Sequence, residues 1–288
     1  MSSHISVPNP TGRLVAEHPG MVKLGRAGWA AKGVVYTIAG VLAATVVFAA
    51  LGWSSTADQE ASPNGALKTI AGSPGGALLL WLLALSMLLY AAWRLTTALL
   101  PGGHDAEALV KRIGYIVSAI IYTTFAFTAL ALARSDDASS QQAANGNAKV
   151  TNLTARIMGN DVGRWVIGLA GLIVIAAGIY RFVKGVTQDV EDELDLSGMS
   201  RERIVWTRRL GAAGEIGRGV AFAVIGFFLV RAAVQFDPKE ATGLDGALRR
   251  LAEQTWGVFV VAVIALGFVA YGVFCLATFT RRRLQAPS

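Results

Sequence analysis

Charged residues are scarce in this chain. They make up 16% of its 288 residues, whereas a soluble domain carries about 25%. Hydrophobic residues reach 53% and the mean hydropathy is +0.50. Because the apolar residues gather in long runs, the composition excludes an ordinary soluble domain and indicates a membrane protein.

Cysteine and histidine are almost absent. Cys275 is the single cysteine, so a disulfide within the chain is impossible. His4, His18 and His104 all lie outside the apolar runs. Haem and buried zinc need His or Cys ligands, so we expect no metal and no cofactor.

Signatures of an enzyme are also missing. The apolar runs offer no Ser–His or Cys–His pair and no paired carboxylates, and no phosphate-binding loop follows a strand. We therefore expect a protein that is not an enzyme.

The first thirty residues also lack a short apolar core with a small-residue cleavage site, which predicts no cleavable signal peptide.

Six long apolar runs are present instead. They cover residues 33–51, 77–99, 113–133, 165–183, 219–236 and 256–280. Each is close to the ~20 residues that a helix needs to cross a bilayer. The runs are continuous rather than alternating, so they predict helices and not strands.

Basic residues gather at the ends of these runs and give a net charge of +7. Most Lys and Arg fall on the side that holds both termini and the second and fourth loops, including Arg281, Arg282 and Arg283. The positive-inside rule then predicts a multi-pass protein of the inner (plasma) membrane with both termini in the cytoplasm. We read the basic residues as topology determinants, with no role in binding nucleic acid.

The predicted organisation has six parts. They are a cytoplasmic tail (1–24), a first hairpin (25–100), a second hairpin (101–187), an acidic cytoplasmic linker (188–208), a third hairpin (209–280) and a basic tail (281–288). Residues 135–149 are polar and predicted to be disordered. The acidic run 188–195 is either a solvated face or a docking site for a basic partner. Ser200 is predicted to cap a short amphipathic helix that reaches Arg209.

The three hairpins resemble one another. Offsets of 86 and 186 residues superpose three sets in the first helices: Gly28, Gly114 and Gly214; Tyr36, Tyr122 and Phe222; and Gly40, Ala126 and Gly226. Offsets of 87 and 181 superpose two sets in the second helices: Gly76, Gly163 and Gly257; and Trp93, Tyr180 and Phe274. Agreement in two separate registers argues against chance similarity.

A further shared feature precedes each second helix. Asn64, Thr151 and Asp245 are residue types that cap helices, and each begins about two helical turns of mixed polarity. We expect three short amphipathic helices at the outer membrane surface. Successive two-span hairpins keep the same orientation, so the repeats are parallel and a pseudo-threefold arrangement of the six transmembrane helices follows.

These residues also carry a family resemblance. The segments RAGWAAKGVVYTIAG (26–40), GEIGRGVAFAVIGFFLVRAA (214–233) and GVFVVAVIALGFVAYGVF (257–274) resemble the bacterial, mainly actinobacterial, membrane family called domain of unknown function 1206. The second repeat departs most, with Ser118 at a usually basic position and Ala177 where Tyr90 and Tyr271 stand. The resemblance implies a six-helix triple hairpin and no particular activity.

Two groups of residues are candidate sites. Lys32, Glu215 and Arg218 form either a structural group near the helix ends or a polar ligand pathway, since charges within spans are costly. Arg94 and Arg181 stand beside Trp93 and Tyr180. These two arginines are either plain interfacial anchors or binders of anionic lipid headgroups.

Two functions stay open at this stage. The first is a transporter or carrier that binds a hydrophobic or lipid-like ligand in a central cavity. The second is a non-catalytic accessory or scaffold subunit of a larger membrane complex, with run 188–195 as its contact. The candidate partners are the bilayer, anionic lipids, a hydrophobic small molecule and a membrane protein. Whether Lys32, Glu215 and Arg218 converge or face outward separates the two functions.

Overall fold

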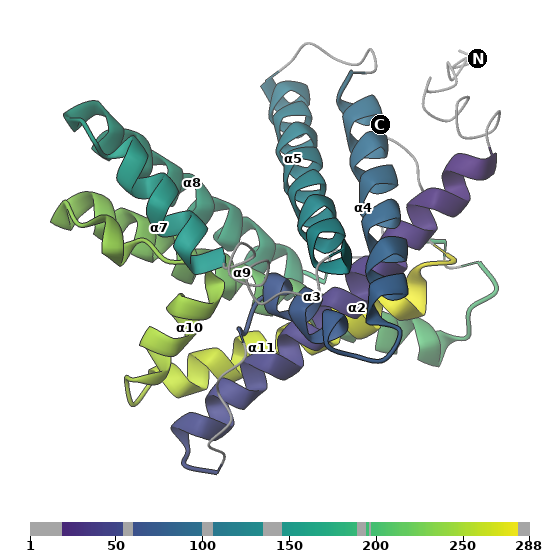
Figure 1. Cartoon of the computed structure of the whole chain (residues 1–288). Helices are drawn as coiled ribbons and strands as arrows, with labels where there is room; N and C mark the ends of the chain where they lie inside the picture. Colours follow the sequence, from purple (N-terminus) through teal and green to yellow (C-terminus); the bar gives the residue numbers. More distant parts are fainter. Residues whose placement is uncertain are drawn as a thin grey trace, which may run out of the picture.

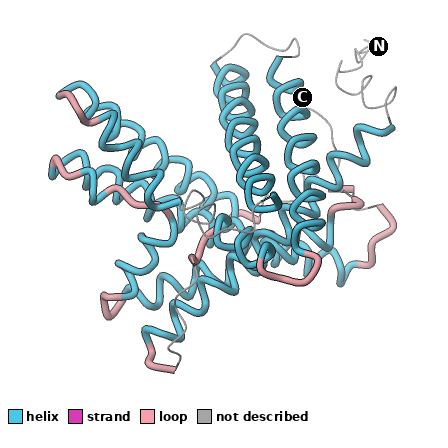
Figure 2. The backbone as a smooth tube through the Cα atoms, viewed as in Figure 1, coloured by secondary structure: helices cyan, strands magenta, loops and turns pink. Residues whose placement is uncertain are grey.

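Helices make up the whole regular structure of the part described here. The computed structural model describes residues 19–53, 60–99, 106–134, 146–188, 194–195 and 197–281. Within these ranges no strand occurs (Figure 1, Figure 2). The elements are α2 (Pro19–Ala50), α3 (Pro63–Ala71), α4 (Gly76–Leu99), α5 (Ala106–Arg134), α7 (Gly146–Ile157), α8 (Asp161–Val186), α9 (Arg201–Gln235), the 3-10 turn η1 (Pro238–Glu240), α10 (Leu244–Ala252) and α11 (Gly257–Thr278).

Six of these helices are long and apolar enough to cross a membrane, which confirms the six predicted spans. They comprise Gly28–Ala50 of α2, Arg112–Arg134 of α5, Val162–Val186 of α8, and the whole of α4, α9 and α11. The shortest, α11, has 22 residues, about 33 Å of helix against about 30 Å of hydrocarbon. A helix satisfies its own backbone hydrogen bonds, which lipid cannot do.

The fifth span is longer than predicted. Ser200 does cap a helix, and its hydroxyl accepts a hydrogen bond from the Arg203 backbone N–H at 3.4 Å. The helix does not stop near Arg209, however, but continues as α9 for 35 residues. Gly211 and Gly214 lie inside it and are buried in packing, which outweighs their low helix propensity. Residues 201–208 of the predicted linker therefore belong to the third hairpin's first helix.

The three short helices α3, α7 and α10 confirm the predicted helix before each second span. The predicted caps are wrong. Ser62 caps α3 by accepting from the Gly65 N–H at 3.2 Å, and Gly243 precedes α10. Thr151 lies within α7, where its hydroxyl donates to the Ala241 carbonyl at 2.8 Å. The offsets between repeats thus placed the helices correctly but missed their first residues.

Helix α7 also corrects the predicted disorder. Residues 146–149 of the segment expected to be disordered form its first turn. Residues 135–145 of that segment, and residues 189–193 of the acidic run, lie outside the described residues. The N-terminal tail is described only from Pro19, where α2 begins.

The most extensive helix contacts lie between hairpins rather than within them. The second helix of each hairpin packs on the first helix of the next: α4 on α5, α8 on α9, and α11 on α2. This last contact joins the end of the chain to its beginning. The three contacts form a cycle, and we call them the between-hairpin seams (Figure 1).

Small residues spaced seven apart allow the close approach at two of these seams. In α8/α9, a Cβ added to Gly226 would lie 2.6 Å from the Gly171 carbonyl oxygen, and one added to Gly178 would lie 2.7 Å from that of Gly219. The repeat-equivalent pairs in α2/α11 are Gly40 with Ala265 and Gly33 with Gly272. The equivalent positions of α4 and α5 hold four buried alanines: Ala84, Ala91, Ala119 and Ala126. Small side chains let transmembrane helices pack through their backbones.

The three within-hairpin seams differ from one another. In the third hairpin α9 and α11 touch, and a Cβ on Gly217 would lie 2.6 Å from the Cα of Gly267. In the first, α2 and α4 meet over a smaller area and leave an apolar pocket of ≈ 450 Å³. In the second, α5 and α8 make no comparable contact within the described residues, and the two helices diverge in Figure 1.

A polar network connects the three hairpins at the side of the short helices. The buried carboxylate of Asp245 accepts hydrogen bonds from the Ala61 N–H at 2.7 Å and the Asn147 amide at 3.0 Å, and pairs with Arg249 at 3.0 Å. The Asn147 amide oxygen accepts from the Gly246 N–H at 3.2 Å. One side chain from the third hairpin therefore binds groups from the first and second, and we call this network the clasp.

Candidate functional site

Lys32, Glu215 and Arg218 converge inside the protein. They expose only 8%, 9% and 4% of their surface. Lys32 lies in α2, and the other two lie in the first half of α9. With Arg94 of α4 and Arg181 of α8 they form a group that we call the charged cluster. All five residues fall within spans, where a charge costs roughly 2.5–3.5 kcal/mol even on a lenient scale.

Glu215 is the central anion of the charged cluster. Its Oε1 pairs with Arg218 Nη1 at 2.8 Å, and its Oε2 pairs with Arg181 Nη1 at 3.0 Å. Glu215 and Arg218 are three residues apart on α9, the i,i+3 spacing at which helix side chains meet. The Arg181 pair joins α8 to α9 and was not foreseen.

Arg218 is more completely buried than Glu215. Its guanidinium lies 4.0 Å from the ring centre of Tyr271 and 5.4 Å from that of Tyr36. Its Nε is buried without a hydrogen-bond partner. An unsatisfied buried donor costs about 1–3 kcal/mol, so this atom stands ready to donate to a further acceptor.

Lys32 sits among aromatic rings from three helices. Its Nζ lies 4.8 Å from the ring centre of Trp29, 5.1 Å from Tyr271 and 5.8 Å from Tyr122. Cation–π contacts of this kind stabilise a desolvated ammonium. The same side chain also lies within electrostatic range of Glu215.

Arg94 contacts a neighbouring pair of tyrosines, of which Tyr90 packs edge to face on Tyr122 at 4.7 Å between ring centres. Its Nη2 and Nε donate to the Tyr90 hydroxyl at 2.6 and 2.9 Å, and its guanidinium lies 5.1 Å from the rings of Tyr90 and Tyr115. Within the described residues no carboxylate pairs with Arg94. Arg94 and Arg181 thus each have a partner inside the protein, and their predicted role at lipid headgroups stays a prediction.

The repeat explains why these residues meet. Lys32, Ser118 and Arg218 are equivalent, as are Arg94, Arg181 and Cys275. The hairpins pack in a cycle, and the equivalent Lys32 and Arg218 of two hairpins lie beside the same ring, that of Tyr271. Charges on different repeats are therefore brought together although they lie far apart in the sequence.

The aromatic residues around the charged cluster were not predicted as site residues. Tyr36 and Tyr122 are half-buried and equivalent to Phe222, over which Arg181 stacks at 5.2 Å. Tyr90 and Tyr271 are buried and equivalent to each other. Their equivalent positions in the three repeats could have pointed to them. Aromatic residues in spans, however, also serve as ordinary core residues.

The second hairpin lacks one of these aromatic residues, which accounts for its open seam. Tyr90 and Tyr271 pack on Gly28 and Gly214, where an added Cβ would lie 2.9 and 2.7 Å from the tyrosine Cβ. Gly114, equivalent to these glycines, has no atom within 4 Å of such a Cβ. Ala177 replaces the tyrosine here, so α8 has no side chain to fill the space beside α5.

The end of the acidic run 188–195 packs against aromatic rings beside the cluster, on the side where α2 begins and α11 ends. Leu194 exposes 3% of its surface and packs with Trp29, Tyr271 and Phe274. The neighbouring Asp195 N–H donates to the Arg281 carbonyl at 2.8 Å, and the Arg281 side chain donates to the Ser197 carbonyl at 2.9 Å. The end of the acidic run 188–195 is thereby attached to the residues that follow α11.

The charged cluster favours an anion over a cation. Among the described residues, three cations, Lys32, Arg181 and Arg218, lie around one carboxylate, Glu215, and Arg94 lies beside the neighbouring Tyr122. Among the described residues no group of three or more His, Cys, Asp or Glu could hold a metal ion. Guanidinium groups bind carboxylate and phosphate through paired hydrogen bonds, so this chemistry suits an acidic ligand group.

Comparison with known proteins agrees with this architecture but gives no activity. An uncharacterized protein of Bacillus subtilis (strain 168), YxxB, is 33% identical over 263 residues, which cover 90% of each chain. No solved structure matches this chain. The family described as Domain of Unknown Function (DUF1206) matches three times, at residues 27–100, 113–188 and 213–278. These matches coincide with the three hairpins, and the chain therefore belongs to the DUF1206 family of membrane proteins with unknown function.

Proposed function

We propose that this chain is a membrane carrier, without enzymatic activity of its own, for a lipid-like ligand that bears an acidic group. The observation that carries the proposal is the excess of cations around Glu215, where Lys32 and Arg218 are buried and Arg181 is partly buried. Buried cations without a full set of counter-ions are destabilising in the membrane. An acidic ligand would supply the missing negative charge.

The arrangement of the hairpins supports a shared interior site. We infer a pseudo-threefold relation about an axis along the membrane normal, as the three equivalent between-hairpin seams would require. Among the described residues α5 and α8 lack the extensive contact that α9 and α11 make, and this breaks the symmetry on one side. A ligand dissolved in the bilayer would reach the charged cluster from that side, past the half-buried Tyr122.

The proposed orientation puts the charged cluster in the cytoplasmic half of a plasma membrane. The cluster lies towards the starts of α2 and α9 and the ends of α4 and α8. The distribution of Lys and Arg favours the cytoplasm for this side. The ligand would thus be received from, or delivered to, the inner leaflet.

Reconstitution into liposomes tests the carrier function. A fluorescent acidic single-chain lipid is added to one leaflet, and its arrival in the other is followed by quenching. We expect faster movement with the protein, and at least a tenfold loss of that acceleration in the double variant Arg94→Gln/Arg218→Gln.

Arg164→Gln is the matched control. The Arg164 guanidinium also stacks on an aromatic ring, at 3.9 Å from Phe236, but at the opposite end of α8 and α9. It should leave movement unchanged. Equal movement with the double variant and the wild type would contradict the carrier function.

The accessory-subunit alternative stays a prediction. The acidic run 188–195, its expected contact, lies mostly outside the described residues. Copurification of a stoichiometric membrane protein that is lost on deletion of this run would favour it.

A further inference from the structure

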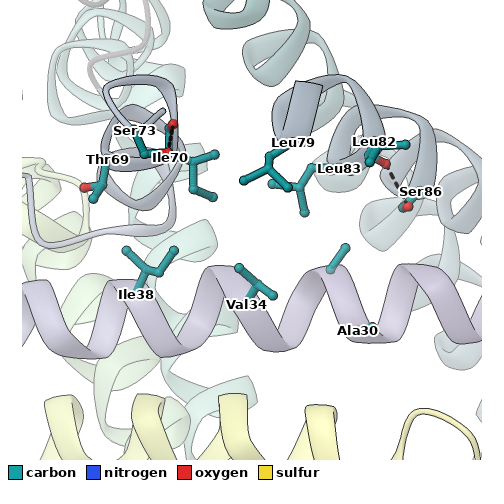
Figure 3. Close-up of a pocket in the computed structure, with 11 residues that line it drawn as sticks. Ala30, Val34, Ile38, Thr69, Ile70, Ser73, Leu79, Leu82, Leu83 and Ser86 are labelled. Carbon is teal, nitrogen blue, oxygen red and sulfur yellow. Dashed lines mark hydrogen bonds between the residues drawn. The ribbon is translucent and has the colours of Figure 1, made fainter. Parts of the chain in front are cut away.

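The apolar pocket of the first hairpin lies between α2, α3 and α4 (Figure 3). Val34 and Ile38 of α2 face Ile70 of α3 and Leu79 and Leu83 of α4 across it. Its volume of ≈ 450 Å³ is within the range of ligand sites, about 300–1,000 Å³.

The few polar groups of this pocket are already satisfied. The hydroxyl of Ser86 donates to the Leu82 carbonyl at 2.8 Å, and that of Ser73 donates to the Ile70 carbonyl at 2.7 Å. The Thr69 hydroxyl donates to the Gly65 carbonyl at 3.0 Å. The pocket therefore offers an occupant no unsatisfied hydroxyl donor and suits a hydrocarbon chain.

The pocket exists because the first hairpin departs from the third. Ala31 and Ser86 line it at the positions equivalent to Gly217 and Gly267, where α9 and α11 touch. In the second hairpin the equivalent residues, Val117 and Ile173, are 48% and 60% exposed. Of the three equivalent places, one is closed, one is open, and this one is an open-sided hollow with α3 at its edge, where Leu79 and Leu82 stay 49% and 53% exposed.

One face of α4 connects the pocket to the charged cluster. Leu83, Ser86, Tyr90 and Arg94 follow one another at three- or four-residue spacing, which places them on one stripe of the helix. Ser86 and Arg94 are eight residues apart, or about 12 Å along the axis. Tyr90 stands between them, packed on Gly28 of α2, with its hydroxyl bonded to Arg94.

We propose that this pocket holds the hydrocarbon chain of a single-chain acidic amphiphile whose carboxylate or phosphate pairs with Arg94. The inference rests on the proposed function and adds the place where the hydrocarbon chain of the ligand binds. Charge complementarity identifies the occupant, because Arg94 has phenol contacts and no carboxylate partner among the described residues. The Tyr90 side chain lies between the pocket and the charged cluster. The head group passes it to reach Arg94.

Photoaffinity labelling of the full-length protein in nanodiscs tests the position of the chain. Three probes carry the same diazirine-bearing twelve-carbon chain: a fatty acid, a lysophosphatidic acid and a neutral monoacylglycerol. The two acidic probes should label peptides of α2, α3 and α4 at one probe per protein. Preference for one of them identifies the acid as carboxylate or phosphate.

A pair of equivalent substitutions makes the test specific. Ser86→Phe fills the pocket and should reduce labelling of these peptides at least tenfold. Ile173→Phe places the same ring at the equivalent, exposed position of α8 and should leave labelling unchanged. Ala31→Leu fills the pocket from the opposite wall and replaces Ser86→Phe if that variant does not fold.

The outcomes separate this inference from the proposed function. Full labelling of Ser86→Phe or Ala31→Leu, or labelling spread equally over α5 and α8, would show that the hydrocarbon chain does not bind in this pocket. In that case loss of acidic-probe labelling in Arg94→Gln/Arg218→Gln would still support the carrier. Equal labelling by the acidic and neutral probes overturns the role of Arg94 whichever peptides are labelled.

Discussion

Two buried carboxylates lie towards opposite ends of the third hairpin, and their surroundings differ in charge. Asp245, in the clasp, pairs with one arginine and accepts two neutral hydrogen bonds. Glu215, in the charged cluster, lies among Lys32, Arg181 and Arg218. The clasp is electrically balanced and the cluster is not.

This difference separates a structural network from a candidate binding site. The clasp joins groups from all three hairpins and satisfies the buried Asp245 oxygens. The cluster leaves Arg218 Nε without an acceptor and gives Arg94 a phenol instead of a carboxylate. Folding alone gains nothing from additional buried cations, so the excess favours a ligand.

Removal of the clasp carboxylate should have the largest effect on stability. Asp245→Ala removes the carboxylate that accepts from the Ala61 N–H and pairs with Arg249. We expect a loss of about 3 kcal/mol in the free energy of unfolding, as for other broken buried networks. Thermal unfolding in detergent measures it. Binding of an acidic amphiphile to the folded fraction should stay unchanged, and reduced affinity would contradict a purely structural clasp.

Two equivalent glycine substitutions should change stability in opposite directions, one beside the charged cluster and one at the open α5/α8 seam. Gly214→Ala places a Cβ 2.7 Å from that of Tyr271, which stacks on Arg218, and should destabilise by about 2 kcal/mol through overpacking. Gly114→Ala meets no atom within 4 Å and should stabilise α5 by about 0.5–1 kcal/mol. Both values come from thermal unfolding; destabilisation by Gly114→Ala would show that α5 and α8 pack here.

Neutralising the carboxylate of the charged cluster should raise the affinity for an acidic ligand, whereas loss of a binding contact would lower it. Glu215→Gln keeps the shape of the side chain and removes the negative charge that pairs with Arg181 and Arg218. Affinity for an acidic amphiphile should rise about tenfold, or about 1.4 kcal/mol. Equilibrium binding with a radiolabelled fatty acid measures it. An affinity that falls would mean that Glu215 positions the ligand rather than competing with it.

The smallest effect is expected at an outer ion pair. Lys68 and Glu60 are joined at 2.9 Å beside α3, and the lysine side chain is 24% exposed. Lys68→Gln should lower stability by less than about 1 kcal/mol, as for other partly solvated pairs. Thermal unfolding at low and high salt provides the check. A loss comparable to that of Asp245→Ala would remove the distinction between the clasp and its surroundings.

Much of the fold was predictable because membrane helices depend on local composition. The six spans, the three short helices and the Ser200 cap follow from runs of apolar residues and from the repeat offsets. The first residues of α3, α7 and α10 were mispredicted, because several residue types capable of capping lie close together there. The unbroken α9 was also missed, since buried packing at Gly211 and Gly214 is a tertiary effect.

The candidate site was only partly predictable. Lys32, Glu215 and Arg218 stood out because charges are rare in spans, and their convergence was one of two open alternatives. Arg94 and Arg181 were placed at the membrane surface, because a sequence does not show which way a long side chain turns near a helix end. The pocket depends on Ala31 and Ser86 replacing a glycine pair, which becomes meaningful only once the seams are known.

Native mass spectrometry of the protein, extracted gently from its own membrane, tests the central claim most directly. We predict one acidic amphiphile retained per chain in the wild type and in Arg164→Gln, and its absence in Arg94→Gln/Arg218→Gln. Retention of a neutral lipid, or of the same acidic molecule in the double variant, would contradict the assignment of the charged cluster as an anion site.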